Sequence, residues 1–170
     1  MAVWFWEFLF FSFLGYLLEK AYAALTRAEK RNRKSFFLLP LCPVYGLCVM
    51  LALYLYQWGV PLVFLLFLPT IMEYVLHFYY ETIYQVEYWS YRSVWGNLRG
   101  RVALPFSLCW AALLPLGLFW AQRLFPFFAI LPPAVSYAAW LIFFCDFIAS
   151  RLYLLYRHDT EALHIASFFS

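Results

Sequence analysis

The hydrophobic pattern of this chain consists of long apolar runs separated by short polar connections. Runs of this length predict helices, because a backbone inside a bilayer must satisfy its own hydrogen bonds and about 20 residues cross the hydrocarbon. The alternating segments of about ten residues that build a membrane barrel do not occur. The sequence predicts five membrane-spanning helices, at about residues 3–25, 36–58, 60–82, 102–122 and 134–156.

The composition supports this class and excludes others. Of the 170 residues, 66% are hydrophobic and 12% are charged, whereas a soluble domain is about half apolar and a quarter charged. So apolar a chain can neither cover a water-soluble globule with polar side chains nor stay disordered. The four cysteines lie inside apolar runs, which argues against a disulfide scaffold. We expect an all-α integral membrane protein, with a single polytopic domain at 1–157 and a short cytoplasmic tail at 158–170. The lipid bilayer is its expected partner, and nucleic acid is not.

Lysine and arginine gather in alternate connections. The first connection carries five basic residues and the third carries three, whereas the second carries none and the fourth has only Arg123. Arg157 follows the fifth span directly. Basic loops remain on the cytoplasmic side of a membrane. We therefore expect a multi-pass protein of the cell membrane, with its N-terminus outside and its C-terminus in the cytoplasm.

The third connection, at 83–100, is too aromatic for a solvated loop. It contains three tyrosines and two tryptophans among few aliphatic residues. This composition predicts a segment that lies along the cytoplasmic interface, partly helical, and ends at Gly96 and Gly100.

Two stretches of the chain share a pattern that favours an internal repeat. Glu19-Lys20-Ala21-Tyr22 matches Glu81-Thr82-Ile83-Tyr84, and residues 39–42 parallel residues 104–107. Two helical hairpins that run in the same direction would form a parallel repeat. Glu19 would then face Glu81 at the cytoplasmic mouth of a four-helix bundle, with the fifth helix packed outside. Chance similarity in so biased a composition is the alternative.

The sharpest polar cluster lies in the third predicted span. Helical spacing of i, i+4 and i+8 places Glu73, His77 and Glu81 on one stripe. Three interpretations stay open. Neighbouring helices satisfy the stripe, or its carboxylates and imidazole relay protons or cations. In the third interpretation, the stripe binds a divalent metal ion with a further ligand from Glu19 or Asp146.

Two other acidic residues inside spans have simpler interpretations. Glu7 is close to the outer end of the first span, from which its side chain can reach the interface. Asp146 has Ser150 and Arg151 near its own helix face, which favours an internal hydrogen bond or ion pair.

Basic residues adjoin the first turns of the second and fourth spans. Lys34, Arg99 and Arg101, together with Asn97, could bind an anionic headgroup at the helix N-termini, or they could serve only to set the topology. The sequence has no phosphate-binding glycine loop, Ser-His-Asp order or paired-cysteine zinc motif.

Several motifs resemble a known family. Pro40-Leu41-Cys42-Pro43-Val44-Tyr45-Gly46 resembles the P-x-C-P-I-Y-G signature of small bacterial membrane proteins of the CmpB type, which are catalogued as ABC-transporter permeases. The vertebrate transmembrane protein 229 group shares the pattern. Glu19 resembles the acidic residue of the family near the end of its first span, and Ser90 stands where the family has Asp. A second block matches in order and spacing through Glu73, Glu81, Trp89, Tyr91, Asn97, Gly100 and Arg101.

The resemblance implies a permease. Its substrate would pass a polar cavity that faces the cytoplasm, and five spans imply a homodimer or a separate energising subunit. The residues expected to bind the substrate are Glu19, Tyr45, Glu73, Glu81, Asn97 and Arg101. Two alternatives stay open: an intramembrane enzyme acting on a lipid or isoprenoid, with Glu73, His77 and Glu81 as metal ligands or acid–base groups, and a structural subunit of a membrane complex.

Overall fold

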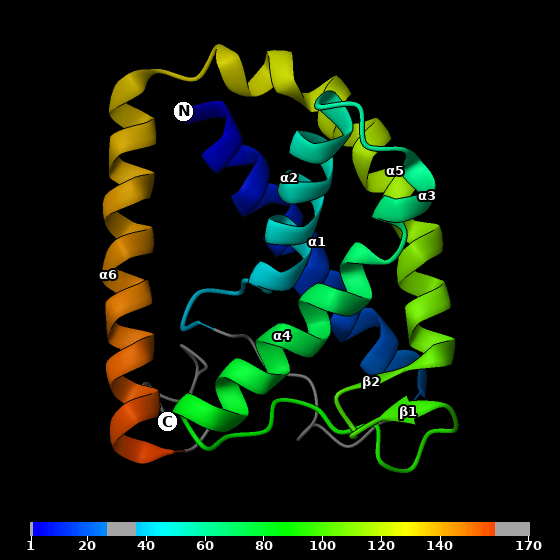
Figure 1. The fold of residues 1–170 in the computed structure, drawn as a ribbon. Coiled ribbons are helices and arrows are strands. Elements are labelled where there is room, and N and C mark those ends of the chain that lie inside the picture. The colour runs from blue at the N-terminus through cyan, green and yellow to red at the C-terminus, as the bar shows by residue number, and fades with distance from the viewer. Residues whose placement is uncertain (1, 27–36, 159–170) are drawn as a thin grey trace.

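The computed structural model describes residues 2–26 and 37–158, in which long helices are joined by non-helical connections and one minimal hairpin. The basic residues of the first connection and the tail after His158 lie outside these ranges. In Figure 1 the long helices alternate in direction, and the N-terminus and the end of the last helix lie at opposite ends of the molecule. The all-α expectation is therefore confirmed. The elements are α1 (Ala2–Thr26), α2 (Pro43–Gln57), α3 (Leu62–Leu65), α4 (Leu68–Ile83), β1 (Asn97–Leu98), β2 (Val102–Ala103), α5 (Leu104–Ala129) and α6 (Pro133–Arg157).

Four helical stretches within the described ranges are long and apolar enough to cross a membrane: Ala2–Leu25, Leu62–Ile83, Leu104–Ala129 and Pro133–Arg157. They match four of the five predicted spans. The stretch Leu62–Ile83, which matches the third predicted span, is interrupted between α3 and α4. Pro69, at the start of α4, supplies no backbone N–H. α5 carries Pro115 and Pro126 in its interior, and its axis bends along its length in Figure 1.

The second predicted span is shorter than expected. We expected a helix over 36–58, but α2 begins at Pro43 and has 15 residues, a length of about 22 Å. The reason is local. Cys42 is in an extended conformation before Pro43, and residues that precede proline disfavour the helical region. The chain from Phe37 to Cys42 therefore crosses part of the bundle without being helical.

α1 and α2 cross with almost no space between their backbones. A Cβ atom added at Gly46 would lie 2.5 Å from the carbonyl oxygen of Phe8 and 2.3 Å from Oγ of Ser12. One added at Gly15 would lie 2.3 Å from the ring of Tyr45. Small residues permit such close approach between membrane helices. The glycine of the family signature is thus required by packing.

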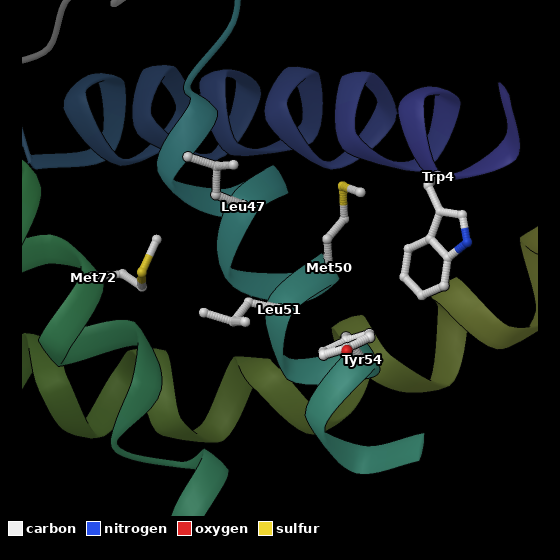
Figure 2. Close-up of a pocket in the computed structure, with 6 residues that line it drawn as sticks. All are labelled: Trp4, Leu47, Met50, Leu51, Tyr54 and Met72. Carbon is white, nitrogen blue, oxygen red and sulfur yellow. The ribbon is translucent and has the colours of Figure 1, made fainter. Parts of the chain in front are cut away.

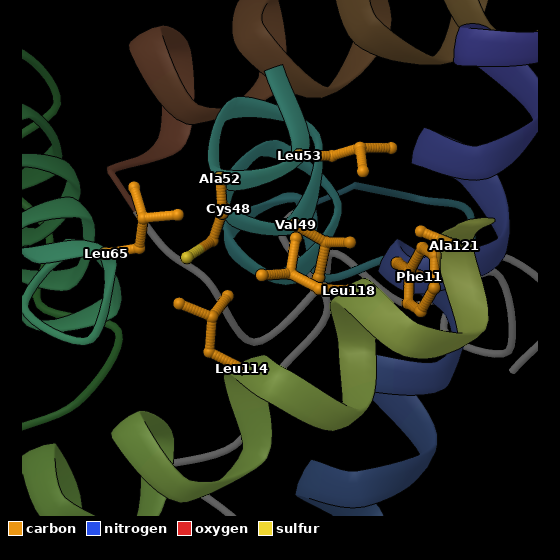
Figure 3. Packing of buried hydrophobic residues seen from close by; sticks show 9 residues of the cluster. All are labelled: Phe11, Cys48, Val49, Ala52, Leu53, Leu65, Leu114, Leu118 and Ala121. Carbon is orange, nitrogen blue, oxygen red and sulfur yellow. The ribbon is translucent and has the colours of Figure 1, made fainter. Parts of the chain in front are cut away.

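The two sides of α2 differ. On one side, a shallow apolar groove of about 400 Å³ is lined by Trp4, Met72 and four residues of α2, Leu47, Met50, Leu51 and Tyr54 (Figure 2). The other side of α2 packs into the main apolar cluster (Figure 3). This cluster joins α1, α2, α3 and α5 through Phe11, Cys48, Val49, Ala52, Leu53, Leu65, Leu114, Leu118 and Ala121.

α6 is the peripheral helix, as expected for the fifth span (Figure 1). Its Trp140 stacks on Phe5 of α1 with ring centroids 4.2 Å apart. Its polar residues hold the non-helical segment: the backbone N–H of Leu38 donates to Ser150 Oγ at 3.0 Å, and that of Leu39 donates to Asp146 Oδ1 at 3.3 Å. Ser150 Oγ also donates to Asp146 Oδ1 at 3.3 Å, so the internal hydrogen bond predicted for Asp146 is confirmed.

The connection between α4 and α5 is not helical, contrary to the expectation of a partly helical interface segment. Its C-terminal part is the hairpin of β1 and β2, in which Asn97 pairs with Ala103. The Asn97 side chain stabilises the chain on both sides of β1: Nδ2 donates to the Val94 carbonyl at 2.8 Å, and Oδ1 accepts from the Gly100 N–H in the turn between the two strands at 3.1 Å. The backbones of Gly96 and Gly100 both have positive φ angles, which glycine adopts most readily.

Arg101 fastens this connection to α4. Its Nε and Nη2 lie 2.9 and 2.8 Å from Oε2 of Glu81, and its Nη1 donates to the Tyr74 hydroxyl at 2.8 Å. Trp89 adds a second fastening: its indole N–H donates to the Arg101 carbonyl at 2.8 Å, and its own carbonyl accepts from His77 Nε2 at 2.9 Å. The loop is therefore attached to one face of α4.

The crossing of α1 and α2 yields a first prediction. The Gly46→Ala substitution should lower the stability by about 1–3 kcal/mol, because the new methyl group meets backbone that cannot move aside. Thermal unfolding of the purified protein in detergent measures the loss. Gly117→Ala is the matched control, since its new Cβ meets only side-chain atoms of Val49, at 3.0 Å. Equal unfolding temperatures for Gly46→Ala and the wild type would contradict the close approach of the two helices.

The Arg101 fastening yields a second prediction. Glu81→Gln should release the loop and raise the rate of trypsin cleavage after Arg99, because the ion pair with Arg101 is lost. The control is Glu87→Gln, which breaks the exposed ion pair of Glu87 with Arg92 instead. Neither substitution removes a trypsin site. Cleavage that rises equally in both variants, or in neither, would show that Glu81 does not hold the loop.

Candidate functional site

A cavity of about 710 Å³ lies between α1, α2, α4 and α5 and is bounded by residues 88–94 of the connecting loop. Its volume falls in the range of small-molecule sites, about 300–1,000 Å³. Most of its wall is apolar or aromatic. The polar groups come from different elements: Glu19 from α1, Tyr45 from α2, Glu73 from α4, Tyr91 from the loop and Trp110 from α5.

Each carboxyl group in the cavity is held by a tyrosine. The Tyr45 hydroxyl donates to Oε1 of Glu19 at 2.7 Å, and the Tyr91 hydroxyl donates to Oε1 of Glu73 at 2.8 Å. The indole of Trp110 packs edge-on against the Tyr45 ring, 5.2 Å away, and also interacts with the Glu73 carboxyl group. Aromatic groups thus fix the orientation of both acids.

The charge of the cavity is one-sided. Two carboxyl groups line it, and among the described residues no Lys, Arg or His does. Glu19 and Glu73 are close enough for their charges to interact. Burial raises the pKa of Tyr88, a loop residue in the cavity wall, well above its ordinary value, so this phenol stays neutral at physiological pH. Such a wall favours a positively charged group and disfavours an anion.

Glu73 is buried in the cavity wall. Its side chain is 6% exposed, and its Oε2 accepts no hydrogen bond that meets normal geometry from the part of the chain described. A buried acceptor without a full partner is costly in a membrane interior. A bound cation beside the carboxyl group would offset this cost through its charge.

The structure divides the six residues that were expected to bind substrate. Glu19, Tyr45 and Glu73 line the cavity, whereas Glu81, Asn97 and Arg101 do not. Glu81 and Arg101 pair with each other, and Asn97 forms a turn. Desolvation alone would lower the pKa of the Arg101 guanidinium, but its hydrogen bonds to Glu81 and Tyr74 outweigh this and raise the pKa. Arg101 is therefore a charged anchor of the loop.

The stripe of Glu73, His77 and Glu81 is helical, as its spacing predicts, but its members take different partners. Glu73 bonds Tyr91, His77 bonds the Trp89 carbonyl, and Glu81 lies 3.7 Å from His77 Nδ1 and pairs with Arg101. Within residues 2–26 and 37–158, no group of three His, Cys, Asp or Glu side chains could hold a metal ion. The metal site stays a prediction that this geometry does not support.

The sequence did not predict the partners of the two cavity acids or the burial of Glu7. Tyr91 and Trp110 contact the acids, yet no spacing rule connects a loop tyrosine with a carboxyl group on α4; the family-like block was the only signal for Tyr91. Glu7 was expected to reach the interface, but it is only 1% exposed in the helix bundle. Its carboxyl oxygens accept no hydrogen bond from the described residues. Glu7 is not part of the cavity wall.

Comparison with known proteins identifies a family for the chain. No curated protein and no solved structure matches the chain. The family model described as "Putative ABC-transporter type IV", of the CmpB type, matches residues 6–153. The match takes in all the cavity residues and the loop that bounds them. This multi-pass membrane protein therefore belongs to the CmpB family that this model describes.

Proposed function

We propose that this protein is a transport component whose intramembrane cavity binds a ligand that carries a positively charged group. The observation that carries the proposal is the pair of tyrosine-held carboxyl groups, Glu19 and Glu73, in a cavity wall that has no basic residue among the described ones. Carboxyl groups inside a membrane are rare and mark substrate or ion pathways. Membership of a transporter family supports the same function.

The end of the cavity near Tyr91 is proposed to face the cytoplasm. The loop that bounds it carries Arg92, Arg99 and Arg101, and Arg157 ends α6 at the same end of the molecule. Toward the opposite end, the basic residue is Arg123 in the last two turns of α5. By the positive-inside rule, the N-terminus is then outside and the C-terminus is in the cytoplasm. A second copy of the chain or a separate energising subunit is the partner we propose, since few helices surround the cavity.

The proposal predicts that the two acids determine cation binding. Radiolabelled tetramethylammonium should bind saturably to the protein in nanodiscs, and Glu73→Gln and Glu19→Gln should each weaken binding about tenfold or more, because one charge partner of the cation is lost. Equilibrium binding with empty nanodiscs subtracted measures the effect, and uptake into proteoliposomes tests transport with the same ion.

Glu87→Gln serves as the control, because Glu87 is exposed and lies outside the cavity. It removes the same charge without touching the site. If the three variants bound tetramethylammonium as the wild type does, the cavity would not be a cation site and the proposal would fail.

A further inference from the structure

The cavity changes in polarity along its length. Glu19, Tyr45, Glu73 and Tyr91 supply its polar part. The wall continues along α1 and α5 with apolar residues only: Phe11, Leu14, Leu113, Leu114, Leu116, Gly117 and Trp120. A ligand that satisfies the whole wall must therefore have a charged end and an apolar end.

The apolar part is long. From Glu19 back to Phe11 there are two turns of α1, a distance of about 12 Å. From Trp110, beside Glu73, to Trp120 there are ten residues of α5, a distance of about 15 Å along a straight helix. These lengths suit an extended hydrocarbon chain better than a compact group such as a small amine.

The same side of the cavity faces the bilayer. Leu18 of α1 and Leu116 and Trp120 of α5 line the cavity, yet they are 46%, 57% and 53% exposed on the surface of the bundle. In a membrane, surface that the protein leaves uncovered on apolar helices contacts lipid chains. The apolar part of the cavity is thus continuous with the hydrocarbon, and a chain can slide into it sideways.

We propose that the ligand is a single-chain amphiphile with a cationic head, which reaches the cavity from the bilayer along α1 and α5. This inference rests on the proposed cation site and adds the tail. The head lies between Glu19 and Glu73, and the chain extends toward Phe11 and Trp120. A phospholipid fits less well, because its anionic phosphate would lie against two carboxyl groups.

The test compares two probes with the same head: tetramethylammonium and dodecyltrimethylammonium. Both are measured on the full chain in nanodiscs, with empty nanodiscs subtracted. Leu116→Trp adds bulk where the tail should lie, and Leu108→Trp adds the same bulk at a comparably exposed leucine of α5 that does not line the cavity. Leu113→Trp, at another exposed lining position, repeats the test if Leu116→Trp fails to fold.

Leu116→Trp should weaken dodecyltrimethylammonium binding about tenfold and leave tetramethylammonium binding unchanged. Leu108→Trp should affect neither probe, and Glu73→Gln should weaken both. Dodecanol, which has the tail without the charge, should not displace the long probe.

The two proposals fail in different ways. If Leu116→Trp changes both probes equally or changes neither, while Glu73→Gln still weakens both, the tail site is wrong and the cation site stands. If Glu73→Gln changes neither probe, the cation site itself is wrong and the amphiphile proposal falls with it. If dodecanol displaces the long probe as efficiently as unlabelled dodecyltrimethylammonium does, the charge contributes nothing to binding of the long probe and the amphiphile proposal is wrong.

Discussion

The structure depends on how a stretch of non-helical backbone is satisfied inside an apolar bundle. Residues 37–42 cannot use helical hydrogen bonds, and an unpaired amide in hydrocarbon costs several kcal/mol. The amides of Leu38 and Leu39 donate to Ser150 and Asp146 of α6, and the amide of Cys42 donates to the Ser12 carbonyl of α1 at 2.9 Å. Because these bonds exist, α2 can begin late, at Pro43, and the bundle keeps a cavity beside its first turns.

The position of Tyr45 follows from this arrangement. It lies at the start of α2, next to the close crossing at Gly46, so its hydroxyl is directed to Glu19 without much freedom. On the other wall, the Arg101–Glu81 pair holds the loop against α4, and the loop presents Tyr91 to Glu73. The crossing of two helices orients one acid of the cavity, and a loop held by an ion pair orients the other. The geometry is prepared before any ligand arrives.

Much of this was open to prediction from the sequence, and the failures have physical causes. Length and hydropathy located four spans, because lipid imposes both on any crossing helix. They overestimated the second span. Hydropathy does not show that the residue before Pro43 disfavours the helical region, or that side chains of α6 accept the hydrogen bonds of Leu38 and Leu39. Helical spacing placed Glu73, His77 and Glu81 on one stripe, but their division between the cavity and the loop depends on Tyr91, Trp89 and Arg101. Tertiary packing sets those partners, and the helical spacing of residues in the sequence carries no information about it.

In the proposed complex, one cavity holds a cationic head at Glu19 and Glu73 and an apolar chain beyond them. The most direct test is a crystal structure with a dodecyltrimethylammonium ion brominated at its chain end, located by anomalous scattering. We expect the head between the two carboxyl groups and the bromine beside Phe11 or Trp120. Bromine in the groove of Trp4 and Met72 (Figure 2), or only on the outer surface of α6, would contradict it.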